Sequence, residues 1–449
     1  MRRGTGAEGN LRGRGRGGKP AAPRWPARLA ALAGVASLLA ATAGRPAVAA
    51  TPGVTDQEIT LGMTSAFKGH AAGLGTEIYR GAMAYFAGVN EAGGVHGRRI
   101  VIKAYDDGYE PDPAVVNTVR LIQHDRVFLL FGNVGTPTTT KVLPLLRKFE
   151  RERVYLWSPF TGAQPHREPP YVQLVVNIRA SYRDETAGLV RNLVQNGRRR
   201  IGIFYQDDAY GRSGQDGVTR ELTRLGLKPA GEASYPRGTR YGASMAQQVA
   251  ILRQAGADAV VAIGAYEACA AFIRDARNAG WQVPIANVSF VGADAMLKLL
   301  LAEGQRSGRD YTSGLVNSQV VPSYDDTSRP LVREYREAMA KYAPRVPEPL
   351  RDPNYTPEPY GFVSLEGYVN ARVLVEVLKR AGRELTREGF MQVVDSLEQL
   401  DIGLGVPITF KAPGGGHRPQ GLDEVFFTVV RGGRWVPLTT WREVVAAAR

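Results

Sequence analysis

The chain has 449 residues, of which 44% are hydrophobic and 22% charged, and its formal net charge is +14. Nine Lys and Arg residues and one Glu in the first 50 residues account for eight of these charges, so the remainder is only modestly basic. This distribution argues against a nucleic-acid-binding protein, because such proteins concentrate basic residues on their folded surface.

The first 50 residues have the layout of a secretory signal peptide. Basic residues come first, an apolar stretch runs from Leu29 to Ala43, and the small residues Ala47-Val48-Ala49 follow. The apolar stretch is shorter than the ~20 residues that a membrane span needs. We therefore predict a signal peptide over residues 1–49 and a mature protein located in the periplasm.

The chain contains a single cysteine, Cys269. It lies within an apolar, helical stretch, so we expect a core residue that forms no intramolecular disulfide. No cysteine lies near the predicted cleavage site to carry a lipid anchor. The sequence thus predicts a secreted protein without a lipid anchor.

After residue 50, short β-branched runs alternate with longer amphipathic segments, which predicts βαβ units on parallel sheets. Two sets of units, divided near residue 177, predict two doubly wound lobes, since about 400 residues are too many for one core. The strands are expected at residues 59–63, 100–104, 127–131, 154–157, 201–205, 259–263 and 315–321. The helices are expected at residues 75–93, 112–125, 138–150, 182–197, 212–226, 242–255, 266–280 and 328–342.

The loops that follow these strands are the candidate binding segments, because ligands of open α/β sheets bind outside the carboxyl ends of the strands. In the loop after Phe131, Thr136 is expected as a helix N-cap and Pro137 as the first helical residue. Free backbone amides and a hydroxyl at a helix N-terminus suit a carboxylate or another anion. Capping without any ligand is the alternative.

Three further loops offer hydroxyls and a glycine that allows close backbone approach. Their candidate residues are Thr161 and Gly162 after the fourth strand, Tyr210 after the fifth and Tyr266 after the sixth. Each tyrosine could instead serve only in surface packing.

The chain contains an ordered series of short motifs: Asn90-Glu91-Ala92-Gly93-Gly94-Val95-His96-Gly97-Arg98, Tyr105-Asp106-Asp107, Gly135-Thr136-Pro137-Thr138, Tyr205-Gln206-Asp207-Asp208-Ala209-Tyr210-Gly211 and Ser364-Leu365-Glu366-Gly367-Tyr368. In this order they resemble the branched-chain amino acid (Leu/Ile/Val-binding) type of periplasmic substrate-binding protein, and the resemblance covers nearly all of the mature chain, from about residue 56 to 437. The resemblance implies the type I periplasmic-binding fold, an α/β fold with two doubly wound Rossmann-like lobes joined by a three-strand hinge. It places residues 50–177 and 318–405 in the N-terminal lobe and residues 178–317 and 406–449 in the C-terminal lobe.

The resemblance also assigns ligand-binding roles by position. The ligand carboxylate would be held by two loops, and aromatic residues would close over it; the residues concerned are Gly135, Thr136, Phe160, Thr161, Gly162, Tyr210 and Tyr266, with Phe362 as a further wall residue. Amino-acid binders of this family carry an acidic residue where this chain has Ser289. An α-ammonium would lose there a charge-assisted partner worth ~1.5–3 kcal/mol. Either Glu267 or Glu366 could replace that partner, although a helical glutamate is commonly a salt-bridged surface residue.

The sequence therefore predicts a receptor that closes on a small amino acid, amide or organic acid and delivers it to an ABC permease. We expect a monomer that meets the membrane only through the permease. A ligand-sensing module for a sensor kinase or chemoreceptor, using the same fold, is the alternative.

Catalysis, cofactors and metals are not expected. The chain lacks the Gly-x-Ser-x-Gly, His-Glu-x-x-His and phosphate-loop motifs, and its five histidines show no spacing typical of metal ligands. His70 is expected as an exposed residue of the loop after the first strand, and contact with a ligand is the alternative. The pairs Asp106-Asp107 and Asp207-Asp208 are interpreted as strand-end capping and hinge residues, not as an acid/base couple.

The first prediction concerns maturation. Since Ala47-Val48-Ala49 fits the small-x-small rule, cleavage is expected after Ala49, with Ala50 as the new N-terminus. Mass spectrometry of the exported protein checks this, and a mature form that retains the segment Arg12–Arg16 would contradict it.

Overall fold

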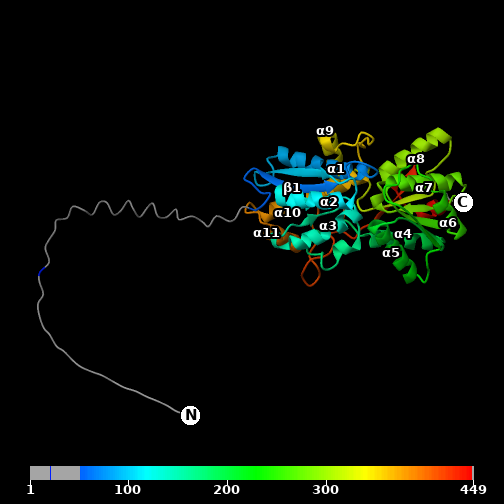
Figure 1. The fold of residues 1–449 in the computed structure, drawn as a ribbon, viewed down its shortest axis with the longest axis horizontal. Coiled ribbons are helices and arrows are strands. Elements are labelled where there is room, and N and C mark those ends of the chain that lie inside the picture. The colour runs from blue at the N-terminus through cyan, green and yellow to red at the C-terminus, as the bar shows by residue number, and fades with distance from the viewer. Residues whose placement is uncertain (1–20, 22–50, 447–449) are drawn as a thin grey trace, which may run out of the picture. The chain divides into compact units, whose positions relative to one another are not determined.

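The computed structural model describes residue 21 and residues 51–446. Apart from residue 21, the predicted signal peptide and its cleavage site lie outside the described residues. Residues 51–446 form one compact unit built on two β-sheets, each flanked by helices. Figure 1 shows the first sheet with β1 and α1 to α3, and the second with the helices α4 to α8. We refer to each sheet with its helices as the first and the second lobe.

The first sheet has the strand order β2-β1-β3-β4-β5, and all its strands are parallel. Its central strands are apolar runs buried on both faces, as parallel sheets require. The strands are β1 (Glu58–Ser65), β2 (Arg99–Asp106), β3 (Leu129–Phe131), β4 (Leu156–Trp157) and β5 (Val175–Val176).

The helices of the first lobe come from two distant parts of the chain. From the first part come α1 (Ala72–Glu91), α2 (Pro111–Val119), which continues as a π-helical turn (Arg120–His124), and α3 (Thr136–Lys148). From the second come α9 (Pro330–Tyr342), α10 (Phe362–Ala381) and α11 (Arg387–Ser396), and short 3₁₀ turns lie at Glu150–Glu152, Gln164–Arg167 and Glu348–Leu350. Both α9 and α10 pack against α1.

The second sheet has the order β12-β11-β10-β9-β8-β6-β7, with β11 and β12 antiparallel to their neighbours. Its strands are β6 (Ile201–Gln206), β7 (Gly231–Tyr235), β8 (Ala259–Ile263), β9 (Ile285–Asn287), β10 (Leu315–Gln319), β11 (Phe426–Arg431) and β12 (Arg434–Pro437). Its helices are α4 (Tyr182–Gln195), α5 (Ala209–Arg224), α6 (Ala246–Gln254), α7 (Tyr266–Asn278), α8 (Ala293–Ser307) and α12 (Trp441–Ala446), with a 3₁₀ turn at Ser289–Val291.

Each strand and helix expected from periodicity overlaps an observed one, with ends shifted by a few residues. Cys269 is fully buried, as expected, and burial raises the pKa of its thiol. The pattern missed the short strands β5, β7 and β9 and much of the chain after residue 285, including α8, α10, α11 and the β11-β12 hairpin. The lobe boundaries assigned by resemblance stay a prediction.

Helices α1 and α10 approach closely because each presents a glycine to the other. A Cβ atom on Gly81 would lie 1.7 Å from the carbonyl oxygen of Ser364, and one on Gly367 would lie 2.3 Å from that of Ile78. Both oxygens belong to the backbone of a helix, so they cannot move aside as the end of a flexible side chain can. The contact brings the chain after residue 361 back onto the first lobe.

This packing predicts that Gly81→Ala lowers the free energy of unfolding by about 1–3 kcal/mol through overpacking. Gly88→Ala is the control on the same helix, because a Cβ there meets only the Tyr342 ring at an ordinary 3.5 Å. That control should be neutral or stabilising by up to about 1 kcal/mol, since alanine favours helix over glycine. Urea unfolding of both variants measures the difference, and equal stabilities would refute the close packing.

Candidate functional site

A cluster of buried aromatic rings fills the space between the carboxyl ends of the two sheets. Its members, the aromatic cluster, are Tyr109, Phe160, Tyr182, Tyr210 and Phe290, each at most 1% exposed. Phe290 lies at the centre: its ring stacks on Phe160 at 5.2 Å and lies 4.5 Å from Tyr210 and 5.9 Å from Tyr109, between ring centroids. Because Tyr109 and Phe160 belong to the first lobe and the other three to the second, the cluster joins the lobes.

Two threonine hydroxyls lie beside this cluster and form the hydroxyl pair. The Oγ1 atoms of Thr136 and Thr161 are 2.7 Å apart, and the Tyr182 hydroxyl is 3.4 Å from Thr136 Oγ1. Burial raises the pKa of Tyr182 to about 12, so this hydroxyl stays protonated and can donate. Three hydroxyls therefore converge at the N-terminus of α3.

Two glycines allow this close approach. Gly135 has φ 109°, and a Cβ there would lie 2.3 Å from the Tyr109 ring. A Cβ on Gly162 would lie 2.5 Å from the Tyr182 ring. The backbone N–H of Tyr182 donates to the Gly162 carbonyl at 2.7 Å. The close approach expected at the Gly162 backbone therefore occurs, and it places this segment of the first lobe directly against Tyr182.

The expectation that Thr136 caps its helix is wrong. Gly135 occupies the N-cap position, Thr136 is the first helical residue, and Pro137 is the second. The positive φ of Gly135 lets the helix begin one residue earlier than expected. The Thr136 side chain makes no capping bond and instead faces Thr161.

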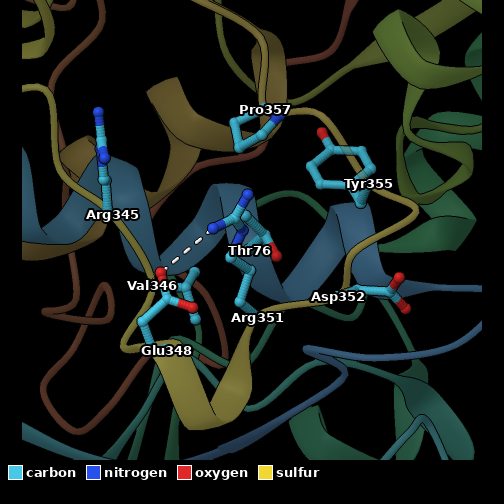
Figure 2. Close-up of a pocket in the computed structure, with 8 residues that line it drawn as sticks. All are labelled: Thr76, Arg345, Val346, Glu348, Arg351, Asp352, Tyr355 and Pro357. Carbon is cyan, nitrogen blue, oxygen red and sulfur yellow. Dashed lines mark hydrogen bonds and ion pairs between the residues drawn. The ribbon is translucent and has the colours of Figure 1, made fainter.

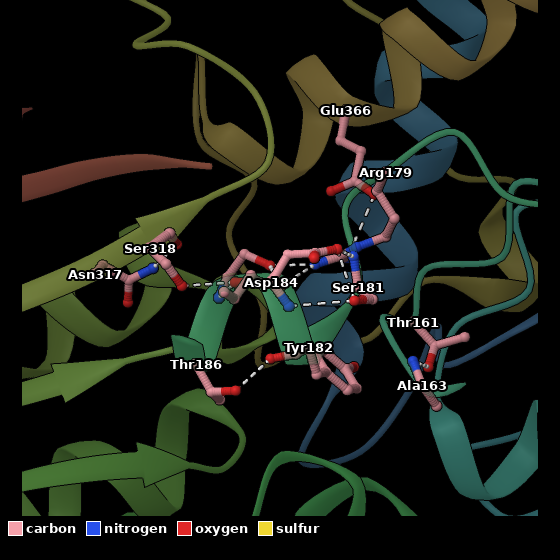
Figure 3. A network of polar contacts seen from close by, with 12 residues as sticks. Thr161, Ala163, Arg179, Ser181, Tyr182, Asp184, Thr186, Asn317, Ser318 and Glu366 are labelled. Atoms are coloured by element: carbon pink, nitrogen blue, oxygen red, sulfur yellow. Dashed lines mark hydrogen bonds and ion pairs between the residues drawn. The ribbon is translucent and has the colours of Figure 1, made fainter. Parts of the chain in front are cut away.

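Arg179, between β5 and α4, carries the only guanidinium that we find over the aromatic cluster among the described residues. It is 1% exposed, and its guanidinium carbon lies 5.0 Å from the centre of the Phe160 ring and 5.8 Å from that of Tyr182. It donates to Ser289 Oγ and, at 3.4 Å, to Glu366 of α10. Figure 3 shows it between Glu366 and the first turn of α4.

Glu185 of α4 is the second ionic partner of Arg179, at 3.0 Å. It also accepts the Ser289 amide at 2.8 Å, Ser289 Oγ at 2.9 Å and Ser318 Oγ at 2.6 Å. A carboxylate offers about four acceptor sites, so Glu185 is saturated by protein groups. A carboxylate thus does lie at Ser289, and it comes from a helix far away in the sequence.

The two remaining predicted residues lie outside the aromatic cluster. The Tyr266 hydroxyl, at the start of α7, accepts the Gly73 amide across the lobes at 3.4 Å. Phe362 opens α10; its amide donates to Asp294 at 2.9 Å, and its ring packs edge-on against Tyr324. The ligand-binding roles of all the predicted site residues stay predictions.

Sequence reasoning missed Tyr109, Tyr182, Arg179 and Phe290 as part of this region. A signal existed for Tyr182, because it opens an expected helix directly after Ser181, which caps α4. Tyr109 follows a strand with φ 67°, which periodicity does not reveal.

The burial and the partners of several other polar residues can be compared with the expectations from the sequence. His70 is buried against the Tyr109 ring, so the expectation of an exposed histidine is wrong, and burial lowers its pKa to about 4. Asp208 caps α5 as expected of a strand-end residue. Glu267 pairs with Arg240 at 2.9 Å, whereas Glu366 is buried.

A separate surface pocket of about 320 Å³ lies between α1 and the segment 345–357. Figure 2 shows its lining, which consists of Thr76, Arg345, Val346, Glu348, Arg351, Asp352, Tyr355 and Pro357. Two arginines face two carboxylates there, and Arg351 pairs with Glu348 at 3.1 Å. Because these charges cancel, the pocket offers no evident charge selection.

No helix among residue 21 and residues 51–446 is both long and apolar enough to cross a bilayer. In the same part of the chain, no three or more His, Cys, Asp or Glu side chains gather as metal ligands would.

The sequence pattern of the family described as "Periplasmic binding protein" matches residues 58–433. The chain belongs to this periplasmic binding protein family. The Leu/Ile/Val-binding protein homolog 7 of Brucella melitensis is 26% identical over 365 residues, covering 78% of this chain and 82% of the relative. The amino acid binding protein of Pseudomonas aeruginosa is 25% identical, and the match spans 50% of this chain and only 58% of that protein's length.

Among solved structures, a possible leucine/isoleucine/valine-binding protein from Rhodopirellula baltica is 33% identical with a TM-score of 0.74. The match covers 88% of this periplasmic binding protein and 99% of that chain. The protein is therefore of the branched-chain amino acid type, and its two lobes have the type I periplasmic-binding fold. The family is one of extracytoplasmic solute-binding proteins, and ABC transport is typical of it.

The buried Glu366 predicts a measurable pH dependence. Burial raises its pKa to about 7, against the partly offsetting effect of Arg179. The folded protein therefore holds the extra proton between about pH 4.5 and 7, and stability from this group is lost as the pH rises through that window. Glutamine does not titrate, so Glu366→Gln lacks this loss. The free energy of unfolding of the variant minus that of the wild type should therefore rise by on the order of 2–3 kcal/mol from pH 5 to pH 8.

Denaturant unfolding at both pH values measures this gain. Glu376→Gln is the control, since Glu376 lies on the same helix in a surface pair with Lys379. A constant difference between Glu366→Gln and wild type would show that Glu366 is ionised throughout.

Proposed function

We propose that this protein is an extracytoplasmic receptor that closes on a small amino acid, amide or organic acid and delivers it to an ABC permease. The observation that supports this proposal is the meeting of the hydroxyl pair and the aromatic cluster between the carboxyl ends of the two sheets. Hydroxyls suited to a carboxylate adjoin rings suited to an apolar body. The protein acts as a receptor, not as an enzyme, and works in the periplasm as a monomer.

In this proposal the ligand first binds the hydroxyl pair of the first lobe. Its carboxylate replaces the bond between Thr136 and Thr161 and accepts from both hydroxyls, as well as from free amides at the start of α3. Tyr210 and Phe290 of the second lobe then cover it when the lobes close. Closure is driven by contacts that exist only in the closed state.

Two ion pairs join the lobes at their rim in the described structure, and in this proposal they form on closure. Arg237 of the second lobe pairs with Glu110 of the first at 2.8 Å. Lys298 of α8 pairs with Glu358, before α10, at 2.7 Å. These pairs are half-exposed or exposed, so each contributes roughly 1 kcal/mol or less. They align the lobes, while the buried ligand contacts supply most of the closing energy.

The names of the relatives support the ligand class at a coarse level. The Pseudomonas relative is named an amino acid binding protein, and the Brucella relative a Leu/Ile/Val-binding homologue. At 25–26% identity these names support a small amphipathic ligand without fixing its chemistry.

A thermal-shift screen of amino acids, amides, ureas and aromatic acids tests solute binding. A ligand at a hundredfold its Kd stabilises the folded state by ~2.7 kcal/mol, which raises the Tm. Uptake of the best hit by cells with and without the gene tests delivery. Binding without any change in uptake would favour the sensing role instead.

Closure itself gives the next prediction. Tyr210→Ala combined with Tyr266→Ala should leave weak binding to the first lobe and abolish the ligand-induced compaction, because both rings act from the second lobe. Small-angle scattering with and without the best hit measures compaction. Tyr171→Ala with Tyr342→Ala is the control, since these half-buried tyrosines of the first lobe lie outside the aromatic cluster. Full compaction of the first double variant would refute the clamp.

A further inference from the structure

The charges around the aromatic cluster indicate which ligands the interlobe site can accept. Four buried carboxylates lie close to the cluster, those of Asp107, Glu185, Asp208 and Glu366. The buried guanidinium above the cluster belongs to Arg179. A ligand ammonium would need one of these carboxylates to be ionised and to have a free acceptor site. The partners of each carboxylate therefore decide the question.

Two of the four carboxylates are saturated. Glu185 accepts from Arg179, from the amide and hydroxyl of Ser289, and from Ser318. Asp208 accepts the amides of Tyr210 and Gly211 on one oxygen and the side chains of Gln206 and Arg237 on the other. With about four acceptor sites on a carboxylate, neither has room for a further donor.

The other two carboxylates are weak partners for an ammonium. Burial raises the pKa of Glu366 to about 7 and that of Asp107 to about 7, so each is about half protonated at neutral pH. Asp107 already accepts the Thr64 hydroxyl and the Tyr109 amide. Glu366 shares the guanidinium of Arg179 with Glu185.

Arg179, by contrast, has a donor to spare. Its Nε–H is buried and has no partner among the described residues. The guanidinium lies over Phe160 and Tyr182, and the Tyr182 hydroxyl reaches the hydroxyl pair. The polar groups with spare donors around the cluster thus suit an anion.

We propose that the interlobe site selects a solute with a carboxylate and an apolar body but no ammonium group, and that Arg179 sets this selectivity by occupying Glu185. The inference rests on the proposed receptor function and names the ligand class of that same site. A carboxylate meets the hydroxyl pair, and the apolar body meets the aromatic cluster. An ammonium would be desolvated there without a charged partner.

Matched ligand pairs test this inference on the wild-type protein. The pairs are 3-phenylpropionate with L-phenylalanine and 4-methylpentanoate with L-leucine, whose members differ only in the α-ammonium. Calorimetry should give a Kd about tenfold or more lower for each acid, since a charge-assisted hydrogen bond accounts for at least that factor.

Equal or tighter binding of an amino acid in either pair would overturn the inference while leaving the receptor function intact. If neither pair binds, the inference also fails, and binding of another solute in the thermal-shift screen would keep the receptor function. A screen in which no solute binds counts against both.

Variants test the role of Arg179. Arg179→Gln should free Glu185 for an ammonium and reduce the preference for the acid about tenfold or more, whereas Arg179→Lys should keep it, because the cation remains. Glu366→Gln is the matched control, because it removes the other carboxylate beside Arg179. The pair between Arg179 and Glu185 remains in this variant, so the preference for the acid should be unchanged. A reduced preference in Glu366→Gln alone would overturn the assignment. If Arg179→Gln fails to fold, the wild-type pairs still decide.

Discussion

The buried ion pair of Arg179 and Glu185 is the interaction on which the arrangement between the lobes depends. Burying an ion pair is favourable only when hydrogen bonds satisfy its remaining acceptors and donors. Glu185 meets this condition through Ser289 and Ser318, which follow or belong to β9 and β10. The pair thereby fixes α4 against the carboxyl ends of two strands. Removing one partner would leave an uncompensated buried charge, which commonly costs 3–5 kcal/mol.

The position of α4 then determines how the lobes meet. Tyr182 is its first residue, and its ring contacts Gly162 of the first lobe and Tyr210 of the second. The aromatic cluster is therefore assembled around a helix that the ion pair holds in place. Phe290 packs at the centre of the cluster because the turn after β9, which carries it, is held by the same glutamate.

Polar and apolar groups divide the tasks of recognition in this region. The hydroxyl pair and Arg179 supply directional donors, while the rings supply apolar surface that changes little with ligand identity. The surface pocket beside α1 differs in kind, since its charges cancel and its arginines are exposed. The candidate site thus contains a buried polar network with its acceptors filled, whereas the surface pocket contains exposed charges of both signs.

The sequence by itself determined the local structure and the class of protein. Periodicity located the strands Ile201–Gln206 and Ala259–Ile263 closely, because buried parallel strands are continuous β-branched runs. The ordered motifs indicated the family, and the loops after the strands contained Thr136, Thr161 and Tyr210. The two-residue strand β4 was expected two residues too long and the three-residue strand β9 was missed, because such short strands carry too little periodicity.

Only the tertiary structure decided which charges neutralise one another. Ser289 appeared to lack an acidic neighbour, yet Glu185, 104 positions away, binds it, and Arg179, 110 positions away, donates to it. Likewise, Thr136 was expected to cap its helix, and a glycine with positive φ takes that position instead. Spacing along the chain reports local periodicity, whereas a buried network is specified by contacts between segments that only folding brings together.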